Sequence, residues 1–540
     1  MSNATTATGR VAAAWHALEA RLMRLSDWLN PILVKETRQA VRSWSFMLTF
    51  VLVLVACWVV TIGGVALIGP SIYFAAGGGE LFRAYFAVLT LPILVVVPFA
   101  AFRSLVAERE DNTYEVVSIT TLRPRQIIGG KLASAVVQMI VYFSAVAPCL
   151  AFTYLLRGID APTIALLLVY TFLASLALAM GGLLLATLAR QRYSQLVISV
   201  GLVAVLLLIF GQAQEVADEM VRGGYSLVGN REFWISQFFF LWGYATSLAL
   251  AYFAAAAMIT FVSENRSTPL RILMLCQQAA YVGWAAYLWI DSDYSPTVVA
   301  MVMNSICGYW FLMGSMLDGE RADLSRRAMR RLPQSGLGRL FLTWLNPGPS
   351  SGYVFAVANL TAMLALAIVA AIVSQPSAQA AGTAPGNQHL VVQLLIAWSY
   401  AVAYLGLGRL VVALVRNVSE VTIFASVLLH ALLLLAGTGI PTTIQWMSLN
   451  LQNELYSYLQ VTNPIWTLAY LSDYGAAPEE TVLATALPAA ALCLLLLNLP
   501  GAVRELRRVR TSLPARVAED EAELNPLPEL LPKNPWDSNE

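Results

Sequence analysis

The chain has 540 residues, of which 58% are hydrophobic and only 12% are charged, and its formal net charge is +1. Soluble domains are roughly 45–50% apolar and about 25% charged, so the composition excludes an ordinary soluble protein and indicates an integral membrane protein with many spans. A net charge this close to zero gives no indication of nucleic-acid binding, and we expect no such partner.

The first predicted element is an amphipathic helical region over residues 1–43. Apolar residues recur there at helical spacing, and Asn30-Pro31 interrupts the pattern, with Pro31 suited to be the first residue of a second helix. We expect this region to lie on the inner membrane surface and to lead into the first span, and a surface-exposed leader helix with no special task is the alternative. The residues expected at this interface are Trp28, Pro31, Lys35, Glu36 and Arg38.

The apolar runs that follow predict about twelve transmembrane helices, because a bilayer core needs about 20 apolar residues per helix. With both termini in the cytoplasm, only Arg83, Arg157, Arg222 and Arg231 fall on the outer side or at outer helix ends, as the positive-inside rule requires. The sequence therefore predicts an all-α polytopic helix bundle with cytoplasmic termini. The expected spans are 46–68, 82–102, 132–156, 161–188, 194–212, 234–262, 272–290, 297–317, 353–374, 390–415, 421–440 and 482–503.

The spans divide into two dissimilar halves, since the charged pattern at 103–131 has no second copy later in the chain. The Arg-rich inner loop 318–350 could contact anionic lipid headgroups or an acidic partner, or could act only as a topological anchor. The outer segment 441–481 predicts short helices packed at the membrane interface. The predicted regions are 1–43; a six-span unit, 44–263, that includes 103–131; a divergent unit of about six spans, 264–504; and a disordered cytoplasmic tail, 505–540.

Residues 103–131 form the most distinctive charged segment, with Glu108, Arg109, Glu110 and Asp111 consecutive. Each such residue at the centre of a bilayer helix costs about 2.5–3.5 kcal/mol, so this segment is expected in water beside the membrane. Ala107–Ser118 is predicted to form a short helix that mixes charged and apolar residues, which suits a partner's groove. An ordinary charged loop is the alternative.

The sequence lacks the patterns of an enzyme. The nearest sequence to a phosphate-binding loop, Arg125–Lys131, has Arg where the first glycine is required, so ATP hydrolysis by this chain is not expected. No metal or cofactor set is present either, because the histidines are far apart. His430 lies within a span, where a neutral imidazole bonded to the helix backbone is favoured over a functional role. Buried, inert thiols are expected at Cys57, Cys149, Cys276, Cys307 and Cys493.

Two stretches carry a resemblance to a known family. N-P-I-L-V-K-E-T-R-Q at 30–39, followed after two spans by E-R-E-D-N-T-Y-E and T-T-L-R-P-R-Q-I-I-G-G-K, resembles the ABC-2 type permeases, the membrane subunits of ATP-binding-cassette transporters. The resemblance covers about residues 30–262. Asn112 and Tyr114 depart from it, standing where Gly and Leu are common in the family, and about twelve spans exceed the family's usual six.

The resemblance implies an exporter driven by a separate cytoplasmic ATPase that docks between spans two and three. It further implies a homodimer, or a heterodimer with another permease, surrounded by membrane lipids. The scarcity of lysine beside arginine points to a GC-rich bacterial genome, and the expected location is the cytoplasmic (inner) membrane of a bacterium. A secondary transporter and a non-transporting scaffold or assembly factor are the alternatives. The residues that the resemblance assigns to ATPase coupling are Glu108, Arg109, Glu110, Thr113, Glu115, Arg123, Pro124, Arg125 and Lys131.

Overall fold

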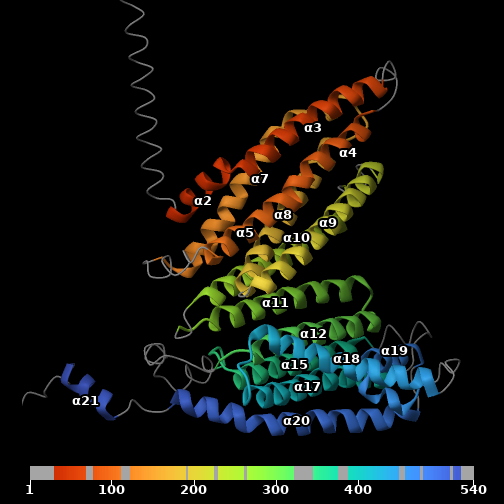
Figure 1. Cartoon of the computed structure of the whole chain (residues 1–540). Helices are drawn as coiled ribbons and strands as arrows, with labels where there is room; N and C mark the ends of the chain where they lie inside the picture. The colour runs from red at the N-terminus through yellow and green to blue at the C-terminus, as the bar shows by residue number, and fades with distance from the viewer. Residues whose placement is uncertain are drawn as a thin grey trace, which may run out of the picture. The chain divides into compact units, whose positions relative to one another are not determined.

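In the computed structural model the described residues form helices and no strand (Figure 1). The structure describes residues 30–68, 77–110, 122–189, 192–223, 229–260, 264–321, 344–374, 387–448, 456–474, 478–510 and 515–524. The helices are α2 (Pro31–Arg42), α3 (Trp44–Ile68), α4 (Gly78–Leu91), η2 (Pro92–Val96), α5 (Val97–Glu110), α7 (Pro124–Leu155), α8 (Ala161–Leu188), α9 (Arg192–Gly223), α10 (Arg231–Ile259), α11 (Thr268–Asp291), α12 (Pro296–Asp318), α15 (Pro349–Val373), α17 (Asn387–Arg416), α18 (Ile423–Ser448), η4 (Tyr458–Thr462), α19 (Pro464–Tyr474), α20 (Pro478–Arg510) and α21 (Ala515–Leu524).

Eleven helices in this part of the chain are long and apolar enough to cross a membrane. The protein is therefore an all-α polytopic membrane protein, because a helix satisfies its own backbone hydrogen bonds in lipid. The expected span 272–290 lies in α11, which does not meet the same criterion. Adjacent Gln277 and Gln278 lower the mean hydropathy of that helix.

The chain divides into two compact units. Unit 1 comprises Met1–Phe261 and Arg266–Trp284, and unit 2 comprises Val262–Asn265 and Ala285–Glu540. Six of the candidate spans belong to unit 1 and five to unit 2, and the division falls within α11. The boundary expected from the sequence lies one helix earlier, between residues 263 and 264.

The interior of unit 1 is built around the span that α4, η2 and α5 form together. Pro92 lacks a backbone N–H, and the helix widens into one π turn from this residue. The Ser175 hydroxyl of α8 donates a hydrogen bond of 2.6 Å to the carbonyl oxygen of Ile93 within that turn. The irregular turn is thus held by a neighbouring helix, and the side chain of Ile93 is fully buried.

Helix α3 shows the opposite pattern, with apolar side chains on its surface. Trp44, Trp58 and Leu67 are among its exposed side chains. Exposed apolar residues along a span are compatible with lipid contact, since lipid tails are as apolar as these side chains.

In unit 2, α17 is the most buried candidate span, and it packs against α12, α15, α18 and α20. Trp310 and Tyr353 are fully buried in this unit. The Tyr353 hydroxyl donates to the carbonyl oxygen of Val402 in α17, at 3.5 Å. Unit 2 therefore has its own interior, independent of that of unit 1.

Short helices occur in 441–481, as the sequence predicts, namely η4 and α19. They pack on α17 and α18 through a buried polar network. Tyr400 in α17 donates to the carbonyl oxygen of Val461, at 2.6 Å. Gln460 donates to the side-chain oxygen of Gln445 in α18, at 2.7 Å, so the segment is fixed by hydrogen bonds at buried positions.

The expected disordered tail, 505–540, contains regular structure. Helix α20 continues to Arg510, and α21 forms from A-R-V-A-E-D-E-A-E-L. Ala, Glu and Leu are strong helix formers, which outweighs the low hydrophobicity on which the prediction of disorder was based. Residues 525–540 lie outside the described part of the chain.

Candidate functional site

The helix before the first span begins at Asn30-Pro31, as predicted. The Asn30 side-chain oxygen accepts a hydrogen bond of 3.1 Å from the backbone N–H of Ile32, and Pro31 is the first helical residue. The Asn30 amide group also donates to the carbonyl oxygen of Gln126 in α7, at 2.6 Å. One side chain therefore starts α2 and attaches it to α7.

The two helices approach each other closely at Gly130. A Cβ atom added there would lie only 2.8 Å from Cβ of Ile32, which is itself buried. A glycine in α7 is required for this packing distance. This close approach places the next residue, Lys131, against α2.

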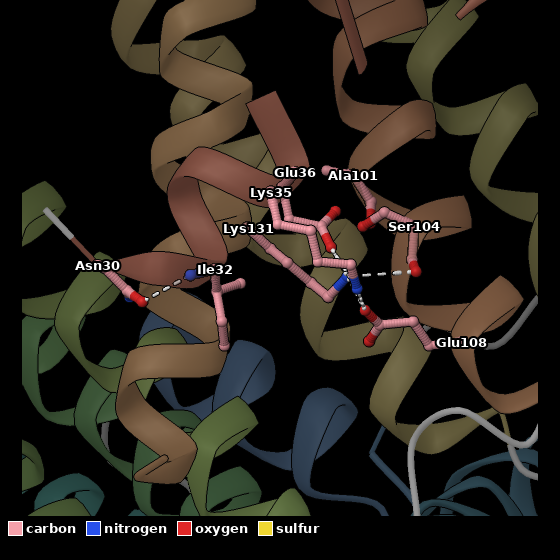
Figure 2. Close-up of polar contacts among 8 residues, drawn as sticks. All are labelled: Asn30, Ile32, Lys35, Glu36, Ala101, Ser104, Glu108 and Lys131. Carbon is pink, nitrogen blue, oxygen red and sulfur yellow. Dashed lines mark hydrogen bonds and ion pairs between the residues drawn. The ribbon is translucent and has the colours of Figure 1, made fainter. Parts of the chain in front are cut away.

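Lys131 lies at the centre of a buried charge cluster formed by α2, α5 and α7 (Figure 2). Its ammonium nitrogen is 3.1 Å from Oε1 of Glu36 and 3.1 Å from Oε1 of Glu108. It also donates to the carbonyl oxygen of Ser104, at 3.3 Å. The side chain of Lys131 is 1% exposed, and those of the two glutamates are 11% and 12% exposed.

A second cation completes the charge balance. Lys35, with a side chain 55% exposed, lies 3.3 Å from Oε1 of Glu108 and 3.7 Å from Oε1 of Glu36. Two lysines thus face two glutamates, and the cluster is neutral as a whole. We call Lys35, Glu36, Glu108 and Lys131 the Lys131 cluster. Removing one partner of a buried ion pair is costly, so this cluster holds the three helices together.

Other residues assigned to coupling support the helices on either side of 111–121. Arg109 donates from Nη1 to the carbonyl oxygens of Ala186 and Thr187, at 3.0 and 3.1 Å, at the C-terminal end of α8. A cation at that position complements the helix dipole. Glu110 lies 3.8 Å from Arg103, and both side chains are substantially exposed.

The three residues assigned at the start of α7 have structural contacts. Arg123 donates its backbone N–H to the Gln126 side chain, at 2.9 Å, and Pro124 is the first residue of the helix. The Arg125 guanidinium lies 4.5 Å from the ring centroid of Phe253 in α10. The Arg125 contact joins α7 to α10, in addition to the contacts that Lys131 makes with α2 and α5.

The predicted residues are thus brought together only in part. Lys35 and Glu36, expected in the interfacial helix, contact Glu108 and Lys131, expected in the coupling segment. Pro31 and Arg38 are exposed on α2 and lie outside the cluster. The predicted residues Trp28, Thr113 and Glu115 lie outside the described residues. Sequence reasoning missed Asn30 and Ser104; the N-cap pattern Asn-Pro was a signal for the first, and no signal marked the second.

A second buried polar pair occurs in unit 2. His430 Nε2 lies 3.2 Å from Oδ2 of Asp318, and both side chains are 0% exposed. The other ring nitrogen lies 2.8 Å from the carbonyl oxygen of Ser426, in the same helix. The expected backbone contact of His430 is present. No sequence pattern marked Asp318, which was expected in a loop and is the last residue of α12.

The remaining candidates for chemistry are side chains that could bind a metal ion or form a disulfide bond. Among the described residues no set of three or more His, Cys, Asp or Glu side chains is arranged to hold a metal ion. All five cysteines are free thiols, and Cys276 and Cys493 are exposed, contrary to the expectation that all five are buried.

Comparison with family models, with curated proteins and with solved structures finds no match for the chain.

Proposed function

We propose that this chain is the transmembrane permease subunit of an ATP-binding-cassette exporter in a bacterial inner membrane. A separate cytoplasmic ATPase would dock on the segment between α5 and α7 and supply the ATP hydrolysis. The observation that carries the proposal is the Lys131 cluster, which joins the helix before the first span to both spans that flank 111–121. The ABC-2-like sequence of this region supports the same assignment.

The contacts suggest how a push on 111–121 would spread through unit 1. The segment is continuous with α5 and leads into α7, which the Lys131 cluster joins to each other and to α2. Arg109 extends the connection from α5 to α8, and Arg125 extends it from α7 to α10. Displacement of this segment would therefore tilt several spans together, which is what a change of access across a membrane requires.

The number of spans agrees with this assignment for unit 1. Its six candidate spans match the number usual in the resembling family, and unit 2 adds five more. A second copy of the chain, or another permease, would complete the transport pathway. Membrane lipids and the ATPase are the other expected partners, and no nucleic acid or cofactor is expected.

The proposal is tested by purifying the tagged chain from its native membrane in mild detergent and identifying the proteins that accompany it by mass spectrometry. A stoichiometric soluble protein with a phosphate-binding loop is expected. The test variant is Glu110→Lys with Glu115→Lys, since Glu110 is substantially exposed, whereas Glu108 is part of the Lys131 cluster and its reversal would disturb the fold.

The matched control is Glu264→Lys, which reverses an exposed acidic residue in a different connection between spans. The double variant should lose the ATPase, while the control should retain it, and both should insert in the membrane to the same extent. A chain that purifies alone, or retention of the ATPase by the double variant, would contradict the docking assignment.

A second candidate function is secondary transport, which the Asp318–His430 pair favours. Ionisable residues within spans are rare and commonly mark ion or proton pathways. Uptake or efflux that persists after ATP depletion and stops when the ion gradient is collapsed would support this candidate over the first. The reverse energy dependence would support the ATP-driven permease.

A further inference from the structure

Unit 2 contains a pocket of about 690 Å³ that the proposed function does not use. Its lining comes from the segment after α12, the beginning of α15, the connection between α17 and α18, and the end of α20. Four separate parts of the chain thus form one depression. Arg321, Arg416 and Arg504 are the basic residues in its lining.

The pocket lies where candidate spans end. Arg321 lies three residues beyond the end of the span Pro296–Asp318, and Pro349 is the first residue of the next span. Arg416 ends the span His389–Arg416, and Arg504 is the penultimate residue of Val482–Glu505. The pocket is therefore at the level of the lipid headgroups, on the side that the positive-inside rule assigns to the cytoplasm.

The two acidic residues of the lining are already engaged. Glu505 accepts hydrogen bonds from the backbone N–H groups of Ser350 and Ser351, at 3.0 and 2.9 Å, and so caps the N-terminus of α15. Glu420 forms an ion pair of 2.5 Å with Arg321. Glu420 is thus paired with Arg321, whereas Glu505 caps a helix and keeps a charge that acts on Arg416.

The other two arginines of the lining form no ion pair within the described residues. Arg416 donates to the backbone carbonyl oxygens of Asp318 and Glu320, at 3.0 and 3.3 Å, and its charge is attracted to the Asp318 and Glu505 carboxylates. Arg504 is exposed and forms no ion pair within the described residues. With three arginines and two carboxylates, the lining has an excess of one positive charge.

The rim of the pocket is apolar at one point. Val418 belongs to the lining and is 90% exposed. A largely exposed valine beside arginines at the end of a span matches the boundary between headgroup and acyl chain. This combination distinguishes a lipid from a small anion dissolved in water.

We infer that this pocket binds the phosphodiester of an anionic phospholipid headgroup. The guanidinium groups donate to the phosphate oxygens, for which the planar fork of arginine is well shaped, and Val418 contacts the adjoining glycerol and acyl region. A phosphodiester carries one negative charge and would neutralise the excess charge of the lining. The inference depends on the membrane spans of unit 2 and is independent of the proposed ATPase docking.

The test measures lipid binding to the purified full chain by native mass spectrometry, with phosphatidylglycerol, phosphatidylcholine and inorganic phosphate as separate probes. The wild-type chain should retain phosphatidylglycerol in preference to phosphatidylcholine. Arg504→Gln should weaken phosphatidylglycerol binding about tenfold, as expected for loss of one charge-assisted hydrogen bond. Val418→Glu should weaken it as well, because it places a negative charge at the rim.

The control is Arg231→Gln, which removes an exposed arginine of unit 1 from the side expected to be outer and should leave binding unchanged. Thermal unfolding of all variants shows whether each is folded, and both test positions are exposed, so each variant is expected to fold. Equal retention of the two lipids, or equal binding by Arg504→Gln and Arg231→Gln, would overturn the inference. Binding of inorganic phosphate at this pocket without retention of phosphatidylglycerol would overturn the assignment to lipid.

Discussion

The two units both place charged groups at the ends of their spans, but they satisfy those groups differently. In unit 1 the Lys131 ammonium contacts two carboxylates and a carbonyl oxygen, and the glutamates keep slight exposure. In unit 2 Asp318 and His430 are fully buried, and although 3.2 Å separates them, neither Asp318 oxygen nor His430 Nε2 has a hydrogen bond of good geometry among the described residues.

The two arrangements are suited to different tasks. A lysine held by three acceptors on three helices fixes those helices relative to one another, since each contact limits the others. A buried pair with poor alignment adds little rigidity, because desolvation of both groups offsets their attraction. We therefore expect unit 1 to transmit displacement at its charge cluster and unit 2 to tolerate neutralisation at its pair.

The largest effect is expected from Lys131→Met. The substitution leaves Glu36 and Glu108 buried with no central cation, so the free energy of unfolding should fall by about 3–5 kcal/mol. The measurement is reversible unfolding of the chain in mixed micelles. The matched control is Lys35→Met, whose side chain is 55% exposed and whose removal should cost less than about 1 kcal/mol.

A third variant shows that the loss arises from charge. Lys131→Met combined with Glu36→Gln and Glu108→Gln removes the buried charges of both signs and leaves only the exposed Lys35, so it should recover most of the stability, as is found when whole buried ion pairs are replaced. Equal losses of unfolding free energy in Lys131→Met and Lys35→Met would show that the cluster does not hold the three helices together.

An intermediate effect is expected from Gly130→Ala. The added Cβ would lie 2.8 Å from Cβ of Ile32, so α2 and α7 must separate, at a cost of about 1–2 kcal/mol. Gly181→Ala is the control, because nothing lies within 4 Å of its added Cβ and alanine is the better helix former, by roughly 0.5–1 kcal/mol. Opposite signs for the two variants in thermal unfolding are the predicted result; a stabilised Gly130→Ala variant would argue against close packing of α2 on α7.

The smallest effect is expected from Asp318→Asn. The amide that replaces the carboxylate can donate to His430 Nε2, and the change removes a desolvated charge, so stability should change by less than about 1 kcal/mol. The same unfolding measurement applies. A loss as large as that of Lys131→Met would mean that the two buried sites are equivalent and would remove the contrast between the units.

Sequence patterns predict the features of this fold that depend on local order. Hydropathy located the spans, and Asn30-Pro31 gave the start of α2. Hydropathy is ambiguous for α11, where Gln277 and Gln278 interrupt the apolar run. Local helix propensity, rather than overall composition, accounts for α21.

Contacts between distant residues were beyond sequence reasoning. Glu36 and Lys131 were each identified, yet they are separated by 95 positions, and no pattern along the chain indicates that they meet. Lys131 was expected to take part in coupling, but it is almost fully buried and can act only by holding α2 against α5 and α7. Asp318 and His430 come together for the same reason, through the packing of α12 on α18.

The most direct test of the central claim identifies what touches the segment between α5 and α7. A photo-crosslinking amino acid is placed at position 114, in native membranes, with position 458, an exposed residue of η4, as the control. We predict an adduct with a phosphate-binding-loop ATPase from position 114 and none from position 458. Adducts only with lipid or with this chain itself from position 114 would contradict an ATPase-driven permease.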